Sequence, residues 1–159
     1  MTTFIERPGS AHQYLMDTIM PLPVKAGLQT ISAVEGVNPV QGIRRLLSVH
    51  KYVADCRIAG GLVISQLDGR LDPVDLPPIV PHQKKELNVY VQASVSDHAK
   101  QYLERYTNPE DPMDLFGFWR SAYGLYSTVR ERKALGANFA ELPGDLHSII
   151  EVEFDELFQ

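Results

Sequence analysis

The feature that most constrains this chain is a stretch of twelve residues, 72–83 (DPVDLPPIVPHQ), which contains four prolines. Proline has no backbone amide and fixes its own φ angle, so this stretch cannot form a helix or a central strand. Because it is apolar rather than rich in glycine and serine, we expect an ordered crossing loop packed on the body of the protein.

The length and composition predict a single globular domain over residues 1–159. A chain of this size buries about 70% of the surface that its unfolded form exposes, which suffices for a core without disulfides or metals. With 44% hydrophobic and 22% charged residues, the chain has the composition of an ordinary globular protein.

The clearest helix signal is Asn38-Pro39-Val40-Gln41. It places an asparagine at the N-cap, a proline at the first helical position and a glutamine three residues after the cap. Apolar residues then recur at three- and four-residue spacing, which predicts an amphipathic helix that ends near Gly60-Gly61. A further helix is predicted from Ser10 to about Met20, and the prolines at 21 and 23 end it. Residues 24–35 are predicted to form a helix, with a strand as the alternative, and a short helix is predicted after Ser96.

Three segments have the pattern of strands. Residues 62–67 (LVISQL) include β-branched side chains and precede an Asp68-Gly69 turn. In residues 87–92, and most regularly in residues 146–154, apolar and polar side chains alternate. Together with the helices, they predict a helix-rich α+β domain with a small sheet of about three strands and the helices on one face.

An aromatic helix is predicted from the Asp111-Pro112 signal to about Leu135, before Gly136. Five of the thirteen residues 114–126 (DLFGFWRSAYGLY) are aromatic, in a chain that is 9% aromatic. One helical stripe, which includes Trp119, is expected in the core. Its neighbouring stripe holds the candidate interface residues Phe116, Arg120 and Tyr123.

Two glycines share one line along that helix. Gly117 and Gly124 lie seven residues apart, where the absence of side chains permits another backbone to approach closely.

The C-terminal residues 155–159 are expected to form a docking tail. Leaving Phe154, Leu157 and Phe158 in water would forgo roughly 1.5 to 3 kcal/mol for each side chain. We therefore expect these three residues to dock on their own domain or on a neighbouring copy, while the acidic residues between them face solvent or a basic partner.

Motifs for catalysis are missing from the sequence. It contains no nucleophile elbow, no phosphate-binding glycine loop, no His-x-x-x-His pair and no CxxC, so we expect no cofactor and no metal. His50 lies on the apolar stripe of its helix, which favours a structural histidine. Asp145, His147 and Glu151 share one strand face, where a divalent cation and a solvated acidic face are both compatible with the pattern.

The charge and termini narrow the possible partners and location. Fifteen Lys and Arg against twenty Asp and Glu give a net charge of −5, which makes nucleic acid a poor partner. The start of the chain lacks a signal-peptide pattern, no apolar run reaches the length of a membrane span, and Cys56 is the only cysteine. These features predict a soluble, cytoplasmic protein without a membrane partner.

The leading functional hypothesis is a non-enzymatic protein-binding module, such as an adaptor subunit, an assembly component or an inhibitor. It would bind a protein partner or a second copy through the aromatic helix and the apolar-acidic tail. One alternative is a small enzyme with a site built from scattered residues, with His50, His98 and Tyr102 as candidates. Another is a nucleic-acid accessory protein that uses Arg44, Arg45, Arg130 and Arg132.

Overall fold

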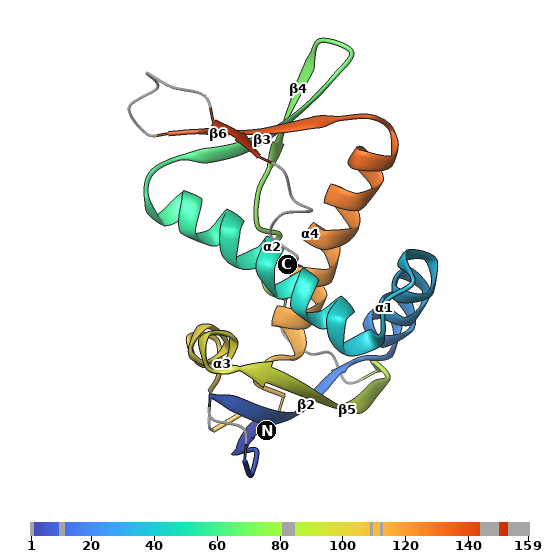
Figure 1. Cartoon of the computed structure of the whole chain (residues 1–159), viewed down its shortest axis with the longest axis vertical. Coiled ribbons are helices and arrows are strands. Elements are labelled where there is room, and N and C mark those ends of the chain that lie inside the picture. Colours follow the sequence, from blue (N-terminus) through green and yellow to red (C-terminus); the bar gives the residue numbers. More distant parts are fainter. Residues whose placement is uncertain are drawn as a thin grey trace. The chain divides into compact units, whose positions relative to one another are not determined.

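The computed structural model describes residues 2–9, 12–80, 85–108, 110–111, 113–143 and 150–152. Within these residues the chain has an α+β fold, as predicted (Figure 1). The elements in chain order are β1 (Thr3–Glu6), β2 (Gln13–Pro21), α1 (Leu22–Glu35), α2 (Pro39–Ile58), β3 (Leu62–Leu67), β4 (Arg70–Val74), β5 (Asn88–Ser96), α3 (Asp97–Glu104), α4 (Phe116–Ala134), β6 (Asn138–Leu142) and β7 (Ile150–Val152).

The chain divides into two compact units, each made from two separate stretches. Unit 1 comprises Met1–Arg44 and Pro78–Ser121, and unit 2 comprises Arg45–Pro77 and Ala122–Gln159. Each unit contains one antiparallel sheet, so the structure adds a second sheet to the single one expected. That residues 1–159 form one domain stays a prediction.

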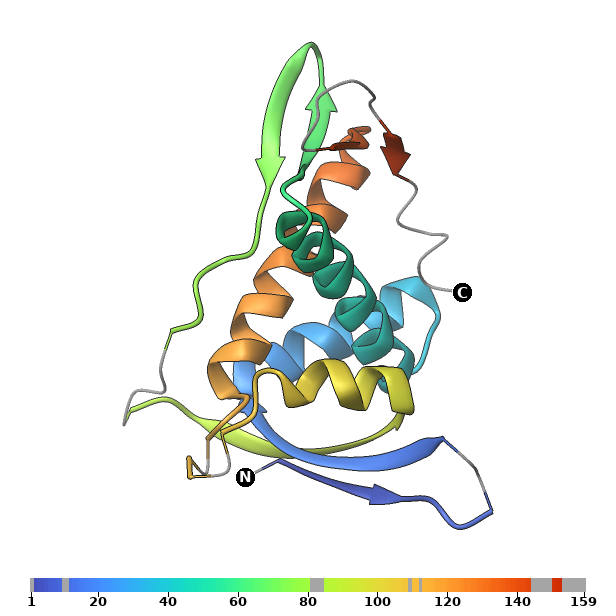
Figure 2. The same cartoon turned by 90° about the vertical axis from the view of Figure 1, so that its left-hand side faces the viewer.

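Unit 1 is built on the sheet β1-β2-β5. Strand β2 pairs with β5 from Gln13 opposite Ser96 to Pro21 opposite Asn88. Helices α1 and α3 lie on the same face of this sheet (Figures 1 and 2). The covered face carries the buried side chains of Met16, Ala93 and Val95.

The core of unit 1 includes the first turns of the aromatic helix. Trp119 is fully buried, and its indole Nε1 donates a hydrogen bond to Thr18 Oγ1 on β2 at 3.1 Å. Phe118 contacts the ring of Trp119 edge-on, with 5.2 Å between centroids, and that of Tyr106 at 4.7 Å. The predicted core stripe is therefore confirmed in this half of the helix.

Unit 2 contains the sheet β4-β3-β6-β7. The β3–β4 hairpin turns at Asp68 and Gly69, whose φ angles of 51° and 78° lie in the left-handed region that this turn requires. Pro73 lies in β4, an outer strand of the sheet, which is where a strand tolerates proline. The first residues of the proline-rich stretch therefore form an edge strand, and residues 75–80 are irregular.

The predicted helix from Ser10 to Met20 is wrong, because Gln13–Pro21 is strand β2. The two prolines do not end a helix but begin the next one. Pro21 is the N-cap of α1, and Pro23 lies in its first turn, where no intrahelical amide is needed. Helix α1 confirms the preferred reading of residues 24–35, and it ends at Gly36 with a left-handed φ of 70°.

Two capping predictions are confirmed. The Asn38 Oδ1 atom accepts a hydrogen bond from the Gln41 amide at 2.9 Å, and the Gln41 side chain accepts one from the Asn38 amide at 3.0 Å. Ser96 Oγ accepts the Ala99 amide at 3.2 Å at the start of α3.

Helix α4 begins at Phe116, five residues later than Asp111. The side chain of Asp114 accepts the Leu115 amide at 2.8 Å and the Thr2 hydroxyl at 2.8 Å. Of the strand predicted over residues 146–154, only Ile150–Val152 lies within the described residues, and it pairs with β6, which the sequence did not reveal.

Candidate protein-binding surface

The face of the β1-β2-β5 sheet that points away from α1 and α3 forms a mixed apolar and polar surface, except at Ile19, which is buried. Side chains that are directly opposite in an antiparallel sheet point to the same face. The register places Ile5, Leu15 and Ser94 in one row, Asp17 and Gln92 in the next, and Tyr90 in a third, opposite Ile19. We call the six residues Ile5, Leu15, Asp17, Tyr90, Gln92 and Ser94 the outer sheet face.

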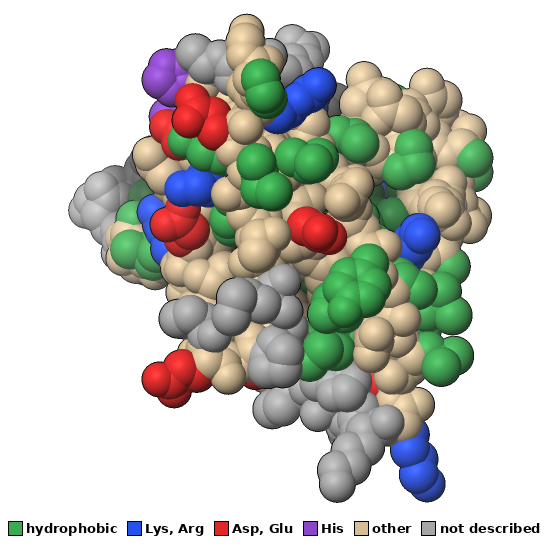
Figure 3. All heavy atoms as spheres, turned by 90° about the horizontal axis from the view of Figure 1, so that it is seen from below, with side chains coloured by type: hydrophobic (Ala, Val, Ile, Leu, Met, Phe, Trp, Pro, Cys, Tyr) green, Lys and Arg blue, Asp and Glu red, His purple; other side chains and the backbone are tan. Residues whose placement is uncertain are grey.

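Two large apolar side chains of the outer sheet face are open to solvent. Tyr90 is 74% exposed and Ile5 is 62% exposed. In the view from below, hydrophobic side chains lie among polar and charged ones (Figure 3). Tyr90 and Ile5 lie on different strands, and the row of Asp17 and Gln92 lies between their rows, so the face alternates apolar and polar side chains.

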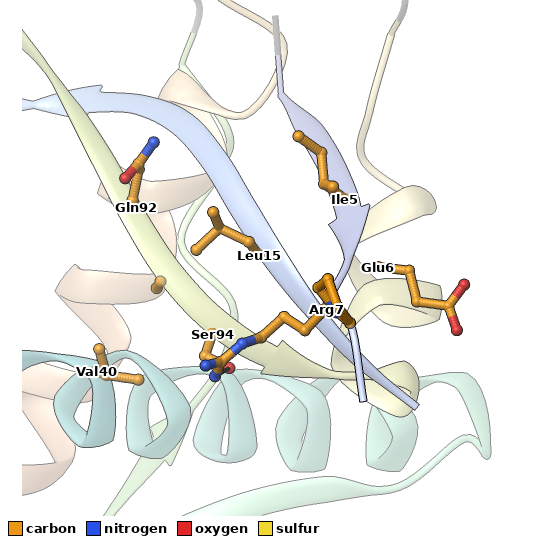
Figure 4. Close-up of a pocket in the computed structure, with 9 residues that line it drawn as sticks. Ile5, Glu6, Arg7, Leu15, Val40, Gln92 and Ser94 are labelled. Carbon is orange, nitrogen blue, oxygen red and sulfur yellow. Dashed lines mark hydrogen bonds between the residues drawn. The ribbon is translucent and has the colours of Figure 1, made fainter. Parts of the chain in front are cut away.

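A groove of about 500 Å³ opens at one end of the outer sheet face. Ile5, Leu15 and Val40 supply apolar side chains to it, with Val40 coming from the first turn of α2 (Figure 4). Gln92 and Ser94 of β5 line the same groove. All of these residues belong to unit 1.

The residues that line the groove include one cationic and one acidic residue, Arg7 and Glu6, and these two side chains point in different directions. The Arg7 side chain extends toward Ser94, to whose Oγ it donates a hydrogen bond at 3.1 Å, whereas the neighbouring Glu6 points away (Figure 4). No described carboxylate pairs with Arg7, so most donors of its guanidinium remain free for a ligand among the residues that the structure describes.

The edge of β5 is contacted by a side chain of α2, whereas no described strand lies beside the edge of β1. Arg44, near the start of α2, points its Nη2 at the Ser94 carbonyl of β5, 3.5 Å away. Strand β1 has no further strand beside it among the described elements. Unpaired strand edges present backbone donors and acceptors to an added strand.

Of the three interface residues predicted on the aromatic helix, Phe116 is not at the surface, whereas Arg120 and Tyr123 are partly exposed. Phe116 is fully buried, and Arg120 lies over its ring at 5.4 Å while pairing with Glu86 at 2.7 Å. Tyr123 is half-buried. Phe116 therefore belongs to the core, contrary to the prediction, and an interface role for Arg120 and Tyr123 stays a prediction.

The chain itself provides the covering segment. A Cβ on Gly117 would lie 2.3 Å from the carbonyl oxygen of Val80 and 3.0 Å from Ile79. The predicted close backbone approach is confirmed at Gly117, and the partner is the end of the proline-rich stretch. At Gly124 the nearest atom is Pro77 Cγ at 3.8 Å, an ordinary contact.

The other predicted interface residues, Phe154, Leu157 and Phe158, lie outside the described residues, as do Asp145 and His147. Glu151 lies in β7, where only the backbone is described.

The three candidate enzyme residues occupy different settings. His50 is 1% exposed on α2, and burial lowers its pKa to about 4, so it is neutral at physiological pH. His98 is exposed on α3. Tyr102 is buried and packs edge-on against the rings of Tyr106 and Phe118, and its hydroxyl lies 3.4 Å from that of Tyr106.

A cluster that the sequence did not suggest joins α2 to β6 in unit 2. Tyr52 Oη donates a hydrogen bond to Glu141 Oε2 at 2.6 Å, and the Glu141 charge also acts on the Cys56 thiol. Burial and the Glu141 charge raise the pKa of Cys56 to about 11, and they raise that of Tyr52 as well. A thiol with so high a pKa is a weak nucleophile near neutral pH.

Of the arginines considered for nucleic acid, Arg132 has a structural role. Its Nη1 donates to Ser65 Oγ and to the Pro73 carbonyl, both at 3.0 Å, and so ties α4 to the β3–β4 hairpin. Arg130 lies 5.9 Å from the centre of the Tyr126 ring.

Among the described residues, no group of three or more His, Cys, Asp or Glu side chains is placed to hold a metal ion. In the same part of the chain, none of the helices combines the length and the apolar character that crossing a bilayer demands. Comparison with protein-family models, curated proteins and solved structures finds no match for this chain.

Proposed function

We propose that this protein is a non-enzymatic protein-binding module, such as an adaptor subunit or assembly component, that binds its partner through the outer sheet face. One observation carries the proposal: Tyr90 and Ile5 are 74% and 62% exposed on the sheet face that no helix of the described residues covers. Tyrosine is enriched at interfaces, because its ring buries a large area and its hydroxyl retains a hydrogen bond.

The surroundings of this face are compatible with strand addition or side-chain docking. The groove beside Ile5 and Leu15 offers a recess for an apolar side chain, and Arg7 offers a charge that fixes its orientation. Strand β1 is the outermost strand of the same sheet among the described elements, so its edge is a place where a partner strand could be added.

Site-specific photocrosslinking in the source cells tests the proposal. Benzoylphenylalanine in place of Tyr90 should give discrete adducts with a protein, either another copy or a different chain. The matched control is the same amino acid in place of Leu135, which is 66% exposed in unit 2. Absence of adducts from position 90, or the same adducts from both positions, would contradict the proposal.

A further inference from the structure

We propose that the groove beside the outer sheet face receives residues 153–159 of a second copy of this chain. This inference rests on the proposed function and names the partner. Three properties of the groove carry it: its apolar lining, its free cationic group and its position beside an open strand edge.

The apolar lining sets the first requirement on the ligand. Ile5, Leu15 and Val40 surround a volume of about 500 Å³, which holds one or two large apolar side chains rather than a folded element. Ile5 alone is 62% exposed, so an occupant would remove substantial apolar surface from water.

Arg7 sets the second requirement. Its guanidinium bonds only to Ser94 Oγ among the described residues, and a carboxylate is the group that matches its paired donors. Asp17 lies one row further along the outer sheet face, next to Gln92, and repels an acid there. An acidic ligand should therefore place its carboxylate at the Arg7 end.

Residues 153–159 (EFDELFQ) have this chemistry. The segment contains three acidic residues, three large apolar ones and no basic residue. It therefore combines a carboxylate for Arg7 with a Phe or Leu side chain for the apolar recess. Reciprocal exchange of this segment between two copies would close a symmetric dimer.

Sedimentation equilibrium of the full chain provides the test. The average mass of the wild type should rise with protein concentration. Arg7→Glu should lower the association constant by at least about tenfold. The segment variant, with Glu153→Arg, Asp155→Arg and Glu156→Arg in one chain, should be weakened similarly. The matched control Arg70→Glu, in unit 2 with a side chain 80% exposed, should associate like wild type.

Mixing the two defective variants shows whether the segment acts between copies. The acidic segment of the Arg7→Glu chain matches the cationic groove of the segment variant, and the two reversed charges also attract each other, so the mixture should recover association. Circular dichroism checks that each variant is folded, and Arg7→Gln replaces Arg7→Glu if that variant is not. A monomeric wild type, association that survives both charge reversals, or a mixture without recovery would overturn this inference.

Failure of the inference is distinguishable from failure of the proposed function. Adducts from position 90 to a different protein, with a monomeric wild type, would retain the outer sheet face as a binding surface while excluding a second copy as its partner.

Discussion

The Val80 carbonyl oxygen lies so close to Gly117 that a Cβ at this position would be only 2.3 Å away. This contact joins the end of the proline-rich stretch to the first turn of α4 and excludes every side chain larger than hydrogen unless the backbone moves. It also explains how a helix with aromatic residues on two neighbouring stripes is covered in unit 1.

We predict that Gly117→Ala lowers the free energy of unfolding by about 1 to 3 kcal/mol, because the added methyl group overpacks against a backbone carbonyl. Gly124→Ala is the matched control in the same helix, since its Cβ would lie 3.8 Å from Pro77. That substitution should stabilise by about 0.5 to 1 kcal/mol through helix propensity. Urea denaturation measures both values, and an equal effect of the two substitutions would contradict the proposed close approach.

The bond between Trp119 and Thr18 gives a second prediction. Thr18→Val retains the shape of the side chain but leaves the buried indole N–H without its acceptor, which should cost about 1 to 3 kcal/mol. In a Trp119→Phe background, the same Thr18→Val change should cost at least about 1 kcal/mol less, because the donor is already gone. Equal costs in the two backgrounds, measured by denaturant melts, would show that the bond does not contribute.

Local signals in the sequence located several element boundaries. The hydrogen bonds between Asn38 and Gln41, and the bond of the Ser96 cap, each join residues three apart. Both caps can therefore be predicted from the local sequence alone. The prolines at 21 and 23 were misread because proline is compatible with the end of one helix and with the start of another. The pairing of β2 with β5, more than 65 residues away, decides between these readings.

The candidate site depends on contacts of that non-local kind. Alternation in β5 separates two faces, but the sequence does not show which face the helices cover. The exposure of Tyr90 and Ile5 could therefore not be predicted from the sequence. Phe116 was expected at the surface because nothing in the local sequence shows that Val80 contacts its helix. The fold class was predictable from patterning, whereas the exposed surface follows from the tertiary arrangement.

Burial of His50 predicts a loss of stability in mild acid. Its pKa is lowered to about 4 in the folded protein, so the folded state keeps the ring neutral while the unfolded chain protonates it below about 6.5. The contribution of His50 is therefore complete above about pH 6.5 and declines as the pH falls toward 4. Between pH 7 and pH 4, wild type should lose about 2 to 3 kcal/mol more than His50→Gln, which removes the titration but not the side-chain polarity. Melts at matched ionic strength measure this difference, and parallel pH profiles for the two proteins would contradict it.

Burial of Cys56 and the negative charge of Glu141 predict an unreactive thiol. With its pKa raised to about 11 and its sulfur buried, Cys56 should react with iodoacetamide at pH 8 at least about 100-fold more slowly than in the unfolded chain. Glu141→Gln removes the nearby negative charge, so it should lower the thiol pKa and accelerate labelling while burial continues to slow it. Tyr52→Phe is the companion variant, because it removes the phenol that donates to Glu141 at 2.6 Å but leaves the carboxylate charge in place. Labelling followed by mass spectrometry between pH 7 and pH 10 gives each rate. Wild-type labelling as fast as that of the unfolded chain would contradict the predicted setting of Cys56, and no acceleration in Glu141→Gln would assign its slow reaction to burial alone.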